Sequence, residues 1–523
     1  MNLASLFPKS EVLGLRSKEH NTPNKLASTG VNGINFGLIQ PVISPPPVEK
    51  KQKDIKIRAY QNKVLNELKN TYNKPKNLNI NIKDLTITTQ PTSKKLRVLF
   101  CGTYPIGQSN GYSRVVYYIS KYLGRHEEDL QLTIYGFQNF KQTAGSEVRN
   151  VPSNVILHDV FANENPKRHG FGEKEIATFL RKNPQDIVII FNDMVITSSL
   201  VQTIVNEMTI DERKAFLLVS YMDQVYPYQK SNFMDVLNTY FDAVITFTPY
   251  WRKTVRMLGL KKEIPCFVFP HGFDHELYFP IPRKLARIFF NLPEDAFIVL
   301  NLNRNQPRKR WDHTMIAFAE LTAEYYKYSI AHPNEKLRGI RLMVGTTLEG
   351  PWDIKEIYSH ELRLRDVPLS FAEEFIVNLS NPQQLSDKDI NVLYNACDVG
   401  INTCEGEGWG LCQIEHLAVG GPQVCPKIGG LQEFLNNDNS TLIDGKWKYY
   451  IDKGRDPIGG IAEIGDPNEY GQALWKYYMD PTLCEKHAKQ GRKDILTHYR
   501  WETVVEYFYH LIKHISKDVK NRI

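Results

Sequence analysis

The sequence predicts an α/β protein with two similar domains, each built on a parallel sheet, and three observations support this. The chain has 523 residues, which is too long for a single hydrophobic core. Short apolar runs, typical of strands that are buried on both faces, alternate with helical stretches. This alternation starts twice, near residues 96 and 296, and a proline-rich segment at 279–284 separates the two series.

The first series begins with an apolar strand at 96–101, a glycine-bearing loop and a helical stretch at 114–124. Strand, loop and helix in this order are the start of a Rossmann-type unit. Helical stretches separate several of the strands that follow, which favours a parallel sheet. These further strands are expected at 131–136, 186–192, 215–221 and 243–247.

The second series has the same organisation. Its strands are expected at 297–303, 341–345, 398–403 and 423–425, and its helices at 311–328, 387–396 and 411–419. The last 40 or so residues have apolar side chains at helical spacing. The predicted boundaries are therefore 96–278 for the first domain, 279–480 for the second, and 481–523 for terminal helices.

Residues 1–95 form a basic, low-complexity segment that we expect to be mostly disordered, with a short helix at 54–72. They carry 16 Lys and Arg against 6 Asp and Glu, or +10, so the rest of the chain holds −3 of the total +7. Such an arm could meet phosphates on a membrane surface, a nucleic acid or another polyanion, although a solvated arm is the simpler interpretation.

Three features concern location. No apolar run is long enough for an integral membrane segment, and the first residues do not resemble a signal peptide. The seven cysteines are scattered and show no zinc-binding spacing. These features predict a cytoplasmic protein with reduced thiols.

The most informative segment is CEGEGWGLCQIEHLAVGG at 404–421, in which three alternating glycines join a strand to a helix starting near Leu411. A helix N-terminus after a parallel strand is an anion site, because its N–H groups are unpaired and its dipole is positive there. Glu407 lies in the loop and Glu415 on the helix. Two carboxylates beside an anion site suggest hydrogen-bond acceptors for sugar or ribose hydroxyls.

The spacing Glu407-x7-Glu415 resembles the E-x7-E signature of retaining family 4 glycosyltransferases of the GT-B fold. The phrases NDMVI, NRNQPRKR, YNACDV and GEGWGL resemble most closely the glycosyltransferases of large DNA viruses such as chlorella viruses. The resemblance covers roughly residues 96–515. It implies two Rossmann-like domains facing across a cleft, with C-terminal helices that cross back to the first domain.

The resemblance also implies donor-binding residues. Arg304 and Lys309, in NRNQPRKRWD, would clamp the diphosphate of a nucleotide-sugar, with Arg308 and Arg310 as alternatives; relatives more often have glycine at positions 303 and 310. The alternative for this loop is a solvated basic turn. Glu407 would contact the donor sugar and Glu415 the ribose. The remaining donor contacts are expected from Gly111, Gly408, Trp409, Gly410 and Leu411.

On the acceptor side, Asp193 and Asp223 follow strands of the first domain, where carboxylates face the interdomain cleft. Either could orient or deprotonate an acceptor hydroxyl, and either could simply cap a helix. His271, in FPHGFD, is interpreted as structural.

Together these residues predict a retaining glycosyltransferase that moves a sugar from a nucleoside-diphosphate sugar to an acceptor hydroxyl. The acceptor is expected to be a glycan, a glycoprotein or a small molecule. No metal and no other cofactor is expected, because basic residues and helix dipoles can neutralise the leaving group. Three alternatives remain for the class of protein: a sugar-nucleotide epimerase, a phosphorylase, and a non-catalytic glycan-binding or virion protein. Given the basic arm, a nucleic acid is an alternative acceptor. If the chain is viral, the host cytoplasm or the virion is its expected location.

Overall fold

The computed structural model describes residues 95–107, 110–140, 149–164, 169–379, 385–451 and 456–518. Residues 1–94, with the predicted arm and its short helix, lie outside this part. All described residues belong to one compact unit.

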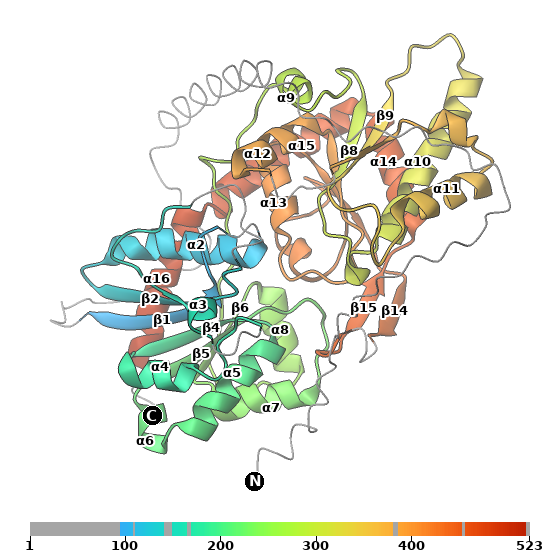
Figure 1. Ribbon diagram of the computed structural model, residues 1–523. Coiled ribbons are helices and arrows are strands. Elements are labelled where there is room, and N and C mark those ends of the chain that lie inside the picture. The colour runs from blue at the N-terminus through green and yellow to red at the C-terminus, as the bar shows by residue number, and fades with distance from the viewer. Residues whose placement is uncertain are drawn as a thin grey trace, which may run out of the picture. The chain divides into compact units, whose positions relative to one another are not determined.

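The N-terminal sheet has seven parallel strands in the order β3-β2-β1-β4-β5-β6-β7 (Figure 1). Its central strands β4 and β5 are buried along their whole length, as the runs IVIIFN and LLVSYM require. The strands are β1 (Leu96–Thr103), β2 (Leu130–Phe137), β3 (Ile156–Asp159), β4 (Ile187–Asn192), β5 (Leu217–Met222), β6 (Ala243–Thr246) and β7 (Cys266–Val268).

Helices lie in most of the connections between these strands, as is usual for parallel pairing; the described residues between β2 and β3 contain none. The helices are α2 (Gly111–Leu123), α3 (Val160–Asn163), α4 (Ile176–Lys182), α5 (Met194–Glu207), α6 (Ile210–Lys214), α7 (Ser231–Tyr240) and α8 (Pro249–Met257).

The second sheet has six parallel strands in the order β10-β9-β8-β11-β12-β13. A separate antiparallel hairpin, β14–β15, follows it in the chain. The strands are β8 (Phe297–Asn301), β9 (Ile340–Val344), β10 (Ile376–Asn378), β11 (Val399–Ile401), β12 (Gln423–Pro426), β13 (Thr441–Ile443), β14 (Trp447–Tyr450) and β15 (Ile461–Ile464).

The helices of the second half divide between the two sheets. Helix α15 packs on α13, whereas α16 packs on α2 and the N-terminal sheet. On α16, the ring of Phe508 stacks on Phe269 at 4.0 Å. The terminal helix therefore crosses back to the first domain, and it is α16 that does so. These helices are α9 (Arg283–Phe289), α10 (Trp311–Ala331), α11 (Ile354–Leu364), α12 (Asp387–Ala396), α13 (Leu411–Ala418), α14 (Pro467–Met479), α15 (Pro481–His498) and α16 (Trp501–Asp518).

The predicted fold class is confirmed. In both sheets the strand order reverses beside the first strand, between β1 and β4 and between β8 and β11. Ligands of open parallel sheets bind at this reversal, outside the carboxyl ends of the strands. The same ends carry the loops that contain Gly111 and Asp193 in the first domain, and Arg304 and Glu407 in the second.

Asp398 joins the central strands of the second sheet. Its carboxylate accepts hydrogen bonds from the Ile298 amide at 2.7 Å and from the buried Arg287 guanidinium at 2.6 Å, and it pairs with Arg283 at 2.9 Å. The substitution Asp398→Ala leaves Arg287 buried without its charge partner, so we expect unfolding free energy to fall by about 3 kcal/mol. Urea denaturation measures this, with Glu374→Ala, whose side chain is 83% exposed, as the control. Equal midpoints for the two variants would contradict the assignment.

Candidate functional site

The loop between β11 and α13 is shaped by Gly410. This residue has a φ of 102°, a left-handed conformation that side chains disfavour, and a Cβ here would lie 2.6 Å from the Leu431 side chain. Gly410 is also the N-cap of α13. Because a glycine cap has no side chain, the first N–H groups of α13 are not covered by a capping group.

The N-termini of α2 and α13 lie next to each other. A Cβ on Gly111, the first residue of α2, would be 3.1 Å from the Leu411 side chain, the first residue of α13. The side chain of Asn110 caps α2 by accepting a hydrogen bond from the Ser113 amide at 2.9 Å. Two positive helix ends therefore meet where the sequence predicted donor contacts.

The glycines of the loop bring it into contact with the first domain. A Cβ on Gly406 would lie 2.5 Å from the Tyr226 ring, and one on Gly408 would lie 2.5 Å from a carboxylate oxygen of Asp223. The carbonyl of Gly408 also accepts a hydrogen bond from the indole of Trp251 at 2.9 Å. From the sequence, these glycines were expected to let the backbone come close to a ligand. In the structure, their lack of side chains lets the loop pack directly against Tyr226 and Asp223 of the first domain.

Glu407 is buried and neutralised by two basic residues. Lys309 donates to its carboxylate, and Arg308 lies 3.7 Å from the same oxygen. Burial alone would raise the pKa of Glu407, but the two cations outweigh it and lower the pKa, so the group is ionised. Arg308 also donates to the Gly406 carbonyl at 2.8 Å. This bond joins the basic loop, residues 303–310, to the glycine loop, residues 402–410 between β11 and α13.

Arg304 differs from the other basic residues of its loop. Its side chain is exposed and its guanidinium has no hydrogen bond or ion pair with any described residue. Lys309 is committed to Glu407, and Arg310 is paired with Asp312 at 2.6 Å. Arg310 has a φ of 48°, a left-handed conformation that side chains disfavour. Arg304 is therefore the basic side chain of this loop that is available to an anion.

Glu415 has a partner that the sequence interpretation missed. Arg114, on the first turns of α2, contacts one carboxylate oxygen at 2.5 Å, and the Tyr394 hydroxyl donates to the other at 2.9 Å. Burial raises the pKa of Glu415, although both partners act against it. The available signal was a basic residue directly after the glycine-bearing loop, but sequence spacing does not reveal a pairing across 301 positions.

The two candidate acceptor carboxylates differ in their surroundings. Asp193 caps α5, accepting from the amides of Val195 at 2.9 Å and Ile196 at 3.1 Å. Asp223 lies against Gly408 and accepts from the Tyr112 hydroxyl. Burial raises the pKa of Asp223 to about 6, even though Tyr112 and Arg308 stabilise its charge. Asp223 is thus beside the glycine loop, and Asp193 has the capping role that was its alternative.

Trp409 and His271 form an aromatic contact under the loop. Their ring centroids lie 5.7 Å apart, and both side chains are buried. Burial lowers the pKa of His271 to about 3, so the imidazole is neutral. Among the described residues, neither ring nitrogen of His271 nor the indole nitrogen of Trp409 has a hydrogen-bond partner, so the structural interpretation of His271 stays a prediction. The Trp409 ring is packed inside the protein and not on the exposed side of the loop.

Two further observations concern the described residues as a whole. They contain no group of three or more His, Cys, Asp or Glu side chains that could hold a metal ion. Over the same residues, no helix combines the length and apolarity that crossing a membrane requires.

Comparison with known proteins connects this geometry to a class. No protein-family model matches the chain. It is 28% identical over 231 residues to a D-inositol 3-phosphate glycosyltransferase of Acidothermus cellulolyticus, covering 43% of this chain and 46% of the relative. With the enzyme of the same name from Mycolicibacterium smegmatis it shares 27% over 224 residues, covering 41% and 45%. The chain thus matches less than half the length of these relatives.

Solved structures resemble the chain over a longer span. Sucrose-phosphate synthase from Thermosynechococcus elongatus superposes with a TM-score of 0.58 at 16% identity, covering 80% of this chain and 99% of that one. HepE of Anabaena, solved with UDP-glucose, gives a TM-score of 0.56 at 16% identity, covering 80% and 100%. At this identity the likeness establishes the fold, which is the GT-B fold of two Rossmann-like domains. The curated relatives named here are bacterial, so the closer resemblance to viral enzymes stays a prediction.

The pair Arg114–Glu415 links α2 to α13 and can be tested without any ligand. Breaking a buried ion pair leaves an uncompensated charge, so we expect Arg114→Met and Glu415→Gln each to lower the unfolding free energy by about 3 kcal/mol. In the double variant the losses should not add, since no charge is left unpaired. Urea denaturation of all four proteins measures the cycle. Additive losses would show that the two side chains stabilise the protein independently.

Proposed function

We propose that this chain is a glycosyltransferase that takes its sugar from a nucleoside-diphosphate donor. The observation that carries the proposal is the meeting of two helix N-termini close to a buried carboxylate, Glu407, and to Arg304, which has no hydrogen bond or ion pair with any described residue. Helix ends and a guanidinium suit a diphosphate, and an ionised carboxylate suits the hydroxyls of a sugar. The similar proteins include enzymes named as glycosyltransferases and a structure solved with UDP-glucose, which supports the same class.

In the proposed reaction the bond between the anomeric carbon and the diphosphate oxygen breaks, and a bond to the acceptor oxygen forms. The diphosphate leaves with the bonding electrons, and its growing charge meets Arg304 and the ends of α2 and α13. The acceptor hydroxyl gives up its proton to Asp223, which lies against the same loop at Gly408. Glu407, held ionised by Lys309, accepts hydrogen bonds from the donor sugar.

The finer assignments rest on the E-x7-E resemblance. We propose retention of anomeric configuration, ribose contact by Glu415 and turnover without a metal ion, since Arg304 and the helix ends supply positive charge. Ribose contact requires Glu415 to share its carboxylate with Arg114 and Tyr394, whose contacts use one lone pair on each oxygen. A cytoplasmic location, a viral origin and polyanion contact through residues 1–95 are proposed on the sequence alone.

A donor screen tests the activity. Purified protein is incubated with UDP-, GDP- and dTDP-sugars, with and without EDTA, and released nucleoside diphosphate is measured. Release from one donor, unchanged by EDTA, is expected. An epimerase would convert the donor sugar without release, and a glycan-binding protein would leave every donor intact, so either result would replace the proposal.

Substitution of Arg304 should weaken the reaction with the donor and leave the stability of the fold unchanged. We expect Arg304→Ala to lower kcat/KM for the donor by about 10- to 100-fold, because a charged hydrogen bond to phosphate is lost. The control is Arg363→Ala, whose side chain is 55% exposed on α11 and whose ion pair is long, at 4.0 Å. Initial rates of nucleotide release measure both. Equal rates for the two variants would remove Arg304 from the donor site.

Asp223 should set the acid limb of the pH profile. Its pKa is raised to about 6, and the proposed base is the ionised form, so activity should be flat above this pH and fall about tenfold per unit below it. Asp223→Asn should abolish this limb and lower the plateau by about 100-fold. Asp193→Asn is the matched control, because asparagine keeps the helix cap. A limb that survives in Asp223→Asn and disappears in Asp193→Asn would exchange the two roles.

A further inference from the structure

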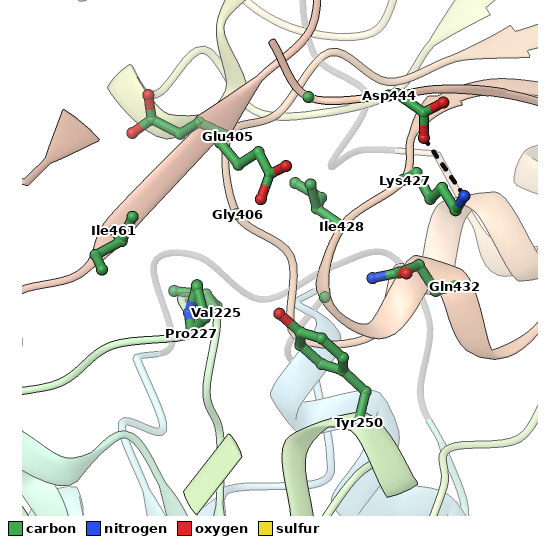
Figure 2. A pocket seen from close by; sticks show the side chains of 13 residues that line it. Val225, Pro227, Tyr250, Glu405, Gly406, Lys427, Ile428, Gln432, Asp444 and Ile461 are labelled. Atoms are coloured by element: carbon green, nitrogen blue, oxygen red, sulfur yellow. Dashed lines mark ion pairs between the residues drawn. The ribbon is translucent and has the colours of Figure 1, made fainter. Parts of the chain in front are cut away.

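A cavity of about 290 Å³ lies beside Glu405 and Gly406 of the glycine loop (Figure 2). It is lined by Val225 and Pro227 after β5, by Tyr250 at the start of α8, and by residues of the second domain. In Figure 2 the hydroxyl of Tyr250 and the amide of Gln432 point toward its centre. Its size is near the lower limit for small-molecule sites, enough for one sugar ring.

The charged groups of the lining are paired. Glu405, Asp444 and Glu463 contribute carboxylates, and their basic partners are Arg310 at 3.7 Å, Lys427 at 3.4 Å and Lys448 at 3.2 Å. A phosphorylated ligand would have to take a cation away from one of these carboxylates, which costs free energy. Carboxylates and amides are, in contrast, good acceptors for neutral hydroxyl groups.

Glu405 is held in place by residues from both domains. The Tyr226 hydroxyl donates to one of its oxygens at 3.0 Å, and the Tyr449 hydroxyl of β14 donates to the other. The hairpin β14–β15 thereby closes one side of the cavity, and two β15 residues, Ile461 and Glu463, line it.

The rim of the cavity carries exposed aromatic rings. Tyr450 pairs across the hairpin with Ile461, so both side chains lie on the face that lines the cavity. Tyr450 is 73% exposed, and its ring meets Tyr228 of the first domain edge to face at 5.8 Å. Two adjoining exposed rings form an apolar surface on which the C–H face of a sugar ring can pack.

From these observations we infer that the cavity and its tyrosine rim bind a neutral oligosaccharide at a site separate from the donor contacts. One sugar unit would occupy the cavity beside the glycine loop, and the next would rest on Tyr450 and Tyr228. This binding does not depend on the proposed transfer reaction.

Direct binding tests the site. The full-length protein is titrated, in NMR saturation-transfer and calorimetric experiments, with neutral di- and trisaccharides of glucose, mannose, galactose and N-acetylglucosamine, and with D-inositol 3-phosphate and glucose 6-phosphate. A neutral trisaccharide should bind more tightly than its disaccharide, and both phosphorylated compounds should bind more weakly. Tyr450→Ala should weaken the trisaccharide by about five- to tenfold.

Trp447→Ala is the matched control. Trp447 lies on the same strand and is 51% exposed, but it pairs with Ile464 at the other end of the hairpin and does not line the cavity, so its substitution should leave binding unchanged. Tighter binding of a phosphorylated compound, no binding of any neutral sugar, or equal effects of the two variants would overturn the inference. Donor hydrolysis by water, followed alongside, should be the same in wild type and Tyr450→Ala. If the wild-type protein hydrolyses no donor, the proposed function is wrong, but the binding result remains valid.

Discussion

The packing of the loop after β5 against the glycine loop before α13 sets the geometry of the whole site. Gly406 and Gly408 have no side chains, so Tyr226 and Asp223 reach the backbone of the second domain directly. That contact brings the Asp223 carboxylate beside the residue that follows Glu407. It also forms the boundary between the two regions of the site, with Lys309 and Glu407 on one side and the cavity beside Glu405 on the other.

Charge pairing is the second constraint, because buried carboxylates are stable only with partners. Glu407 is paired with Lys309, Glu415 with Arg114, and Glu405 with the hydroxyls of Tyr226 and Tyr449. Two of these three carboxylates draw a partner from the first domain. Contact between the two domains therefore completes the partners of Glu415 and Glu405, whereas Glu407 is paired within the second domain.

The sequence was sufficient to predict the fold. Strands such as LRVLFC and IVIIFN are apolar runs that must be buried on both faces, and a parallel sheet covered by helices is the usual structure that buries them. It placed the start of α13 at Leu411, but it expected the first helix from residue 114, whereas α2 begins at Gly111. It missed the short edge strands β3, β7, β10 and β13, which are partly exposed and lack such runs. The partners of Glu415 and Asp223 were missed for a different reason. Arg114 and Tyr112 look like ordinary helix residues, and only the packing of α2 on α13 gives them a role.

These pairings explain why four basic residues in one loop are not interchangeable. Arg308 holds the Gly406 carbonyl, Lys309 neutralises Glu407 and Arg310 bonds Asp312. Each would leave an uncompensated group behind if it turned toward a ligand, which costs free energy. Arg304 has no such obligation among the described residues, so it is the one that can meet a diphosphate without loss elsewhere. In the sequence the four residues look alike. In the structure three of them are paired with protein groups, and Arg304 is the one that is available to a ligand.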